Sequence, residues 1–203
     1  MCKNITNTDK HLCCSCGICE GVCHKEAISL KINEEGFYVP EVDRNKCTDC
    51  GLCYSVCPGD KIEDKRIYNS MKQPVPEDYL IGNVKECFNA KIKDKKLREK
   101  CTSGGMVTGI IKYLLDSDQY DVAFCVNTYN YADQVKTVPI IKGDNLDKTV
   151  QSRYITVSHS NLVKYMLANR EKKVIIVAVG CVITGVRYLI EKFKLNPNNY
   201  LCL

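Results

Sequence analysis

Residues 13–23 read CCSCGICEGVC, and residues 47–57 read CTDCGLCYSVC. The second stretch repeats the first after 34 positions, so the pattern C-x2-C-x2-C-x3-C occurs twice. Four cysteines at this spacing are typical of the ligands of a 4Fe–4S cluster. Three of them on a tight loop can surround one cluster, and Gly17 and Gly51 let the loop backbone approach it closely. The repeat therefore predicts two 4Fe–4S clusters.

The fourth cysteine of each run decides how the ligands are shared. In two-cluster ferredoxins this cysteine binds the cluster of the other run. We therefore expect two crossed ligand sets, one made of Cys13, Cys16, Cys19 and Cys57 (cluster one), the other of Cys47, Cys50, Cys53 and Cys23 (cluster two). Zinc sites take four ligands, often as two separated C-x2-C pairs, so two runs of four cysteines favour iron–sulfur over zinc.

The composition agrees with an intracellular metalloprotein. The chain has 203 residues, 15 of them cysteine, and 45% of its residues are hydrophobic. It is too long for a small disulfide knot and too apolar to be disordered. An odd number of cysteines, a polar N-terminus and the lack of a long apolar run argue against a disulfide framework, a signal peptide and a transmembrane segment. We expect a cytoplasmic protein, where cysteines are kept reduced.

The charge divides the chain unevenly. Residues 1–65 contain 8 basic and 11 acidic residues, whereas residues 66–203 contain 21 and 13. The basic residues are scattered and lack interleaved aromatics, so we expect no nucleic-acid partner. The densest run, residues 91–100, fits either a solvated connector or a docking surface for an acidic redox partner.

Periodicity places the secondary structure. Residues 27–32 and 37–40 read as the two halves of a hairpin between the cysteine runs. Met106 to Leu115 follow helical spacing, with Ser103 as the N-cap. Further strands are expected at residues 121–126, 137–141 and 174–179, and further helices at residues 162–167 and 182–193. The apolar run 174–179 indicates a strand buried on both faces, as in a parallel sheet.

These elements predict an α+β protein. We expect a ferredoxin-like two-cluster domain over residues 1–65, a linker over 66–100, and an α/β domain over 101–203. Leu201 to Leu203 resemble the start of another strand, so we expect the α/β domain to be incomplete at its C-terminus.

Two turns of the second domain are candidate sites. Gly180 and Cys181 follow the strand at 174–179, and ligands bind at the carboxyl ends of strands in open α/β sheets. A helix N-terminus there would lower the pKa of the Cys181 thiol, although a small buried cysteine at a turn fits the spacing equally well. Ser103, Gly104 and Gly105 precede a helix and could expose backbone amides to a phosphate.

The arrangement resembles the beta-subunit family of coenzyme F420 hydrogenases and dehydrogenases. The residues that carry the resemblance are the two cysteine runs, Thr102 to Met106, Gln151 to Tyr154, and Val179 to Cys181. The family implies a flavoprotein that binds FAD and passes electrons between iron–sulfur clusters and a substrate. By that resemblance Ser103, Gly104 and Gly105 lie near the flavin phosphates, and Ser152, Arg153, Tyr154, Gly180 and Cys181 lie near the flavin. The family turn carries a proline that is missing between Gly180 and Cys181.

Two functions follow, and the sequence leaves both open. The first is a flavin-dependent iron–sulfur oxidoreductase, which serves a redox partner protein or a small-molecule electron acceptor. The second is a plain electron carrier, with a ferredoxin module and an α/β domain that docks a partner. A third cluster built from other cysteines, such as Cys14, Cys87, Cys101, Cys125, Cys181 or Cys202, is a further reading that lacks local ligand spacing.

Overall fold

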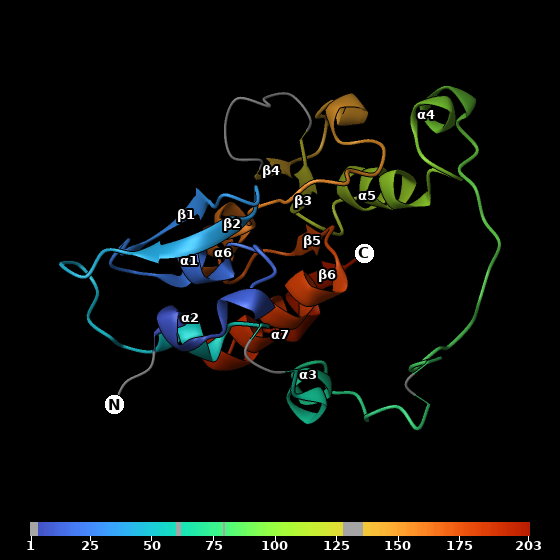
Figure 1. The fold of residues 1–203 in the computed structure, drawn as a ribbon. Helices are drawn as coiled ribbons and strands as arrows, with labels where there is room; N and C mark the ends of the chain where they lie inside the picture. The colour runs from blue at the N-terminus through green and yellow to red at the C-terminus, as the bar shows by residue number, and fades with distance from the viewer. Residues whose placement is uncertain (1–3, 60–61, 79, 128–135) are drawn as a thin grey trace.

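The computed structural model describes residues 4–59, 62–78, 80–127 and 136–203 (Figure 1). Its N-terminal part is a hairpin flanked by two short helices. The hairpin consists of β1 (Ile28–Ile32) and β2 (Tyr38–Val42), paired antiparallel from Ile28↔Val42 to Ile32↔Tyr38. Helices α1 (Ile18–Val22) and α2 (Leu52–Ser55) each begin inside a cysteine run. The hairpin expected between the two runs is therefore present.

Glycine starts both of these helices. Gly17 and Gly51 are the N-cap residues of α1 and α2, with φ of 74° and 77°. This left-handed conformation suits glycine, which has no Cβ to clash. The same backbone turn therefore recurs in both runs, as their sequence repeat predicts. Two 3-10 turns, Ile5–Asn7 and Lys10–Leu12, precede the first run.

The second part is a four-stranded sheet in the order β4-β3-β5-β6. Its strands are β3 (Val122–Val126), β4 (Thr137–Ile140), β5 (Val174–Ile176) and β6 (Tyr200–Cys202). Strands β3, β5 and β6 are parallel, and β4 runs antiparallel to β3. Helices α6 (Ser160–Ala168) and α7 (Gly180–Phe193) connect the parallel strands. The strand expected over residues 174–179 ends earlier, at Ile176.

The sheet buries both of its faces. Val122, Phe124, Val174 and Ile176 point toward α6 and α7, while the alternating residues Ala123, Cys125 and Ile175 pack with Ile111 and Leu115. The last two belong to α5 (Met106–Asp116), which covers the other face. All three β5 side chains are fully buried, as expected for an apolar strand inside a parallel sheet.

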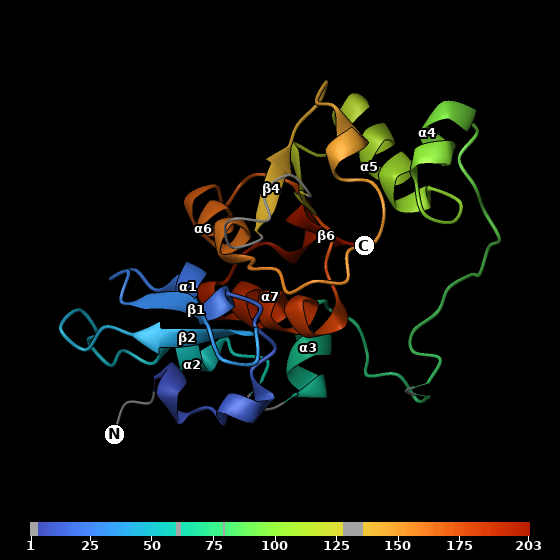
Figure 2. The ribbon, with the colours of Figure 1, turned by 45° about the horizontal axis from the view of Figure 1, so that its top comes forward.

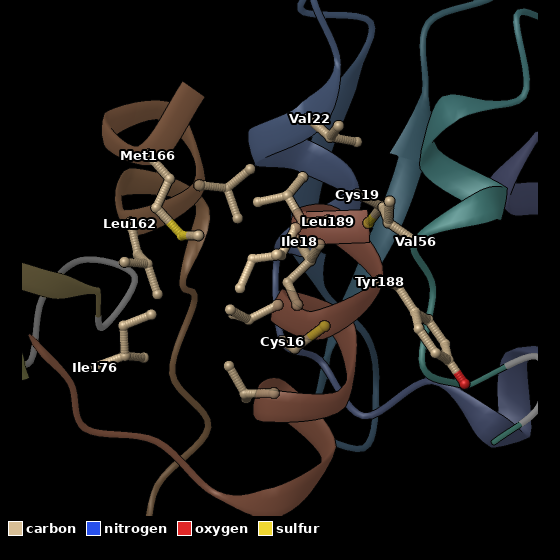
Figure 3. Close-up of a cluster of buried hydrophobic side chains, with 14 of the residues drawn as sticks. Cys16, Ile18, Cys19, Val22, Val56, Leu162, Met166, Ile176, Tyr188 and Leu189 are labelled. Atoms are coloured by element: carbon tan, nitrogen blue, oxygen red, sulfur yellow. The ribbon is translucent and has the colours of Figure 1, made fainter. Parts of the chain in front are cut away.

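One hydrophobic core joins the cysteine-rich part to the sheet. Ile18, Cys19 and Val22 of α1 lie in the same buried cluster as Leu162 and Met166 of α6 and Leu189 of α7 (Figure 3). The contact is close, because a Cβ added at Gly21 would meet Val163 Cβ at 2.6 Å and the Ser160 carbonyl oxygen at 2.7 Å. The two parts are therefore packed as one body and do not merely share a linker.

The segment between residues 66 and 100 is partly helical. Helix α3 (Asp64–Ser70) packs on α7, where Arg66 forms an ion pair with Glu191 and lies 4.1 Å above the Tyr188 ring. Helix α4 (Lys95–Lys100) carries the basic run. Between α3 and α4 the chain runs along the side of the molecule with little regular structure (Figures 1 and 2).

Helices in the described ranges are all too short or too polar to cross a membrane.

Candidate functional site

The thiols of the predicted cluster-one set lie near one another. Burial raises the pKa of the Cys19 thiol, and the neighbouring thiols of Cys57, Cys13 and Cys53 raise it further. Burial also raises the pKa of Cys13, to which Cys14 and Cys57 add smaller contributions. Cys57 belongs to the second run in sequence, yet its thiol lies near those of Cys13 and Cys19 in the first run. This proximity is compatible with crossed ligation, although Cys53 of the other predicted set also lies near Cys19.

The predicted cluster-two set also brings thiols of both runs near one another. Burial raises the pKa of Cys53, opposed by hydrogen bonds from the backbone at Ile5 and Tyr54, and Cys50 and Cys23 raise it further. Cys23 comes from the first run. Two further sulfur atoms of this set also have N–H donors. Ala27 N lies 3.3 Å from Cys23 Sγ, and Asn4 Nδ2 lies 3.9 Å from Cys47 Sγ. Such donors suit a thiolate that binds iron.

The described residues contain no three His, Cys, Asp or Glu side chains close enough together to hold one metal ion. A single zinc ion needs its four ligands around one centre. A 4Fe–4S cluster is a larger body, and each of its irons takes one cysteine. Two such clusters would need the eight cysteines of the two runs.

A second group of thiols forms beside the first run. Cys14 lies within hydrogen-bonding reach of Cys16 and Cys181. The hydrogen bond with Cys16 is the main reason why the pKa of Cys14 falls to about 6, and the same contact raises that of Cys16. The thiol of Cys16, a predicted ligand, therefore faces Cys14 as well as Cys19.

The loop of the first run is fixed to the start of α6. His159 N donates to the Cys16 carbonyl oxygen at 2.8 Å. Gly17 packs against Ser158 so tightly that a Cβ at Gly17 would collide with Ser158 Oγ. Ser158 Oγ is also 3.3 Å from Glu20 Oε2 in α1. The position of the first cysteine loop is thus set by the second part of the chain.

His159 is buried and its side chain is neutral at ordinary pH. Burial lowers its pKa to about 4, against the smaller opposing effect of the Val157 and Cys16 carbonyls. His159 Nδ1 lies 3.1 Å from the Val157 carbonyl oxygen, which fixes Nδ1 as the protonated nitrogen. No described residue hydrogen-bonds to His159 Nε2.

A cavity of about 1140 Å³ opens between the first cysteine loop and the sheet. Cys13, Cys14, Ser15 and His159 line it. The same lining includes the predicted residues Ser103, Gly104, Gly105, Ser152, Arg153 and Tyr154. The second cysteine run contributes no described residue to this lining. The cavity therefore adjoins the predicted cluster one and not cluster two.

The turn before α5 differs from expectation. Gly105, with φ of 71°, is the N-cap, and no side chain caps the helix; Ser103 itself has φ of 54°. Ser103 is therefore not the N-cap that we expected. The segment Ala90–Ile92 explains the glycines, because a Cβ at Gly104 would meet the Ala90 carbonyl oxygen at 2.6 Å. The first turn of α5, Met106 to Thr108, still faces the cavity.

The segment Ser152–Tyr154 lies beside this turn, because Ser152 N donates to Thr102 Oγ1 at 3.1 Å. Arg153 is held by the Val150 carbonyl oxygen, 3.0 Å from Nη2, and by Gln151 Oε1, 3.3 Å from Nη1. Its Nε atom is buried and has no hydrogen-bond partner among the described residues. Tyr154 is 99% exposed at the rim of the cavity.

Gly180 and Cys181 occupy the first turn of α7, as predicted, but they do not line the cavity; their neighbours Val179 and Val182 do. The expected lowering of the Cys181 pKa is wrong. Burial raises it, and the adjacent Cys14 thiol raises it further, while the backbone hydrogen bonds at the helix start lower it less. The desolvation of the thiol therefore outweighs the helix terminus.

Sequence reasoning did not single out Ser158, His159 or Phe37. Ser158 and His159 come directly before an apolar helical run, which reads as an ordinary helix start. Phe37 lies in the hairpin turn and lines the cavity from the cysteine-rich part. Only the packing of distant segments reveals these positions.

Two known families match the chain. Residues 87–164 match the N-terminal domain of the coenzyme F420 hydrogenase/dehydrogenase beta subunit. Residues 12–61 match the 4Fe–4S dicluster domain. The first match includes Ser103–Gly105 and Ser152–Tyr154 and stops before Gly180 and Cys181. No curated protein matches the chain.

Proposed function

We propose that the chain is a flavin-dependent iron–sulfur oxidoreductase, because residues 87–164 match the coenzyme F420 hydrogenase/dehydrogenase beta subunit and residues 12–61 match the 4Fe–4S dicluster domain. An electron-transfer role follows already from the dicluster domain. The proposal adds two clusters with the crossed ligand sets, and FAD in the cavity beside cluster one.

One observation carries the proposal. A single cavity is lined by Cys13–Ser15 and by the residues of both family motifs, Ser103–Gly105 and Ser152–Tyr154. Its volume of about 1140 Å³ exceeds the ~300–1,000 Å³ of sites for drug-sized ligands. A dinucleotide such as FAD is a ligand of suitable size. The chemistry that a bound flavin supplies is the exchange of one hydride for two single electrons.

The chain's own residues suit the diphosphate of FAD. The first turn of an α-helix has N–H groups without helical partners, and Met106 to Thr108 bring this turn of α5 to the cavity. Arg153 is permanently charged, and its buried Nε keeps an unused donor. Helix start and guanidinium together would bind a dianionic group and fix the orientation of the cofactor.

The position of the cavity also suggests which cluster exchanges electrons with the flavin and which with a redox partner. Cluster one would exchange electrons with the flavin because its loop forms the cavity wall. Cluster two would face a redox partner, since its ligand Cys50 is exposed and its run does not reach the cavity. The family name describes a beta subunit, which supports a protein partner.

The test is FAD binding by the anaerobically purified, iron-loaded protein. Arg153→Ala should weaken FAD binding about tenfold or more, because a hydrogen bond to a charged group contributes about 1.5–3 kcal/mol. It should leave the iron content unchanged. Arg98→Ala, at a basic residue of α4 that does not line the cavity, is the matched control.

Iron-loaded wild-type protein that takes up no FAD would overturn the proposal. The chain would then fit the second function, a ferredoxin-type carrier with a docking domain.

A further inference from the structure

Exposed apolar side chains gather at the rim of the cavity. Phe37, Val107, Tyr154, Ile155 and Val179 are between 44% and 99% exposed, and all five line the cavity. They come from four separate segments of the chain. Single exposed hydrophobic residues are normal on a protein surface, but a group of them around a concave site marks a binding site. The rim is therefore suited to an apolar, flat ligand surface.

Phe37 is the apolar contribution of the cysteine-rich part. The other described residues of residues 4–59 that line the cavity are Cys13, Cys14 and Ser15. In both views the turn of the β1–β2 hairpin lies beside the segment that leads to α6 (Figures 1 and 2). The Phe37 side chain is 54% exposed. It gains little from packing inside its own hairpin.

The hairpin turn holds Phe37 rigidly. Phe37 N donates to Asn33 Oδ1 at 2.8 Å, and its carbonyl oxygen accepts from Asn33 N at 2.9 Å. Gly36, at φ of 85°, completes the turn. Both backbone groups of Phe37 are thus fixed before a ligand arrives. A preorganised residue loses little conformational freedom on binding, which increases its contribution to affinity.

We propose that Phe37 is a ring-stacking residue for the ligand of the cavity, and that with Tyr154 it holds a planar ring of bound FAD at the rim. The proposal rests on the proposed function, since it takes FAD as the occupant. Aromatic rings attract each other beyond the area that they bury. Binding would thus engage both parts of the chain, through Phe37 on one side and Arg153 and Tyr154 on the other.

The experiment measures the dissociation constant of FAD for four iron-loaded variants. Phe37→Ala should raise it about tenfold, and Phe37→Leu nearly as much, because leucine restores apolar bulk without a ring. Phe37→Tyr should stay within about threefold of wild type. Ile32→Ala is the matched control. Ile32 is 64% exposed on the same hairpin and does not line the cavity, so its loss should not change FAD binding.

The outcomes separate the two proposals. Wild-type protein that binds no FAD overturns the proposed function and this inference with it. Wild-type protein that binds FAD while Phe37→Ala binds it equally well overturns the inference alone. A Phe37→Leu variant with the FAD dissociation constant of wild type also overturns the inference, because it would show that FAD does not need an aromatic ring at this position. A Phe37→Ala variant that loses iron together with FAD overturns it too, because the loss of FAD would then follow from damage to the cysteine-rich part.

Discussion

At the scale of single residues, the ligands of each predicted cluster depend on which cysteines lie near each other. Cys57 raises the pKa of Cys13 and Cys19, and Cys23 raises that of Cys53. A cysteine of each run thus lies among the thiols of the other. If the two runs exchange ligands as predicted, the loss of one cysteine should damage the cluster to which it is crossed.

Cys57→Ala should therefore remove cluster one although its neighbours in sequence belong to cluster two. The measurement is the iron content together with the electron paramagnetic resonance spectrum of the reduced protein. The Cys57→Ala spectrum should match that of Cys13→Ala and differ from that of Cys50→Ala. A match with Cys50→Ala instead would mean that each run holds its own cluster.

Gly17 is a position where a single added methyl group should destabilise the fold. Gly17→Ala should destabilise the protein by about 1–2 kcal/mol through its left-handed φ, and by about 1–3 kcal/mol more through the collision with Ser158. Gly36 also has a left-handed φ, of 85°, but a Cβ added there would meet no atom within 4 Å. Gly36→Ala should therefore lose only the stability that the backbone conformation costs. Urea unfolding under anaerobic conditions measures both.

A double-mutant cycle with Ser158→Ala isolates the contact. The double variant should recover part of the loss caused by Gly17→Ala, because Ser158 Oγ is the nearest colliding atom. Strictly additive effects, or equal losses for Gly17→Ala and Gly36→Ala, would show that the contact with Ser158 is unimportant.

At the scale of elements, the packing of α1 on α6 joins the two parts of the chain. Met166 is fully buried between them in the shared core (Figure 3). Met166→Ala should cost about 2–5 kcal/mol. Because metal binding and folding are coupled, it should also lower iron retention, although Met166 is far in sequence from every predicted ligand.

Leu80→Ala is the control, since Leu80 is 98% exposed. Iron loss and unfolding should be unchanged in this variant. A Met166→Ala protein that unfolds earlier but keeps its iron through that transition would show that the cysteine-rich part folds independently.

The helices and strands also show how much of the fold could be predicted from the sequence. The hairpin, the helix at Met106–Asp116 and the strand at Val122–Val126 follow from local periodicity, which these residues carry themselves. The helix start at Gly105 was missed because it depends on Ala90–Ile92, which pack against Gly104 and Gly105. Local patterns cannot reveal a contact between segments that lie apart in sequence.

Some residues of the candidate site carry a local sequence signal, and others do not. The two cysteine runs were recognisable because cluster ligation imposes a spacing, whereas the two family motifs were recognisable only through their resemblance to the beta-subunit family. The pKa of Cys181 was predicted in the wrong direction, because burial and the Cys14 thiol act on it across the fold. Phe37 and His159 have no local signal, since only the docking of the two parts makes them line one cavity.

At the scale of the whole molecule, the two parts share a core on one side and a cavity on the other. The core includes Ile18 and Leu189, and the cavity lining includes Cys13 and Arg153. Packing fixes the first cysteine loop, and the cavity places that loop beside the proposed cofactor. We propose that this junction brings a flavin and an iron–sulfur cluster together in one chain.

Anaerobic purification followed by iron, sulfide and flavin analysis tests this claim most directly. We expect about eight iron atoms and about eight sulfides per chain, as two 4Fe–4S clusters require, and about one FAD after incubation with the cofactor. Protein with this iron and sulfide content that still retains no FAD would contradict the claim.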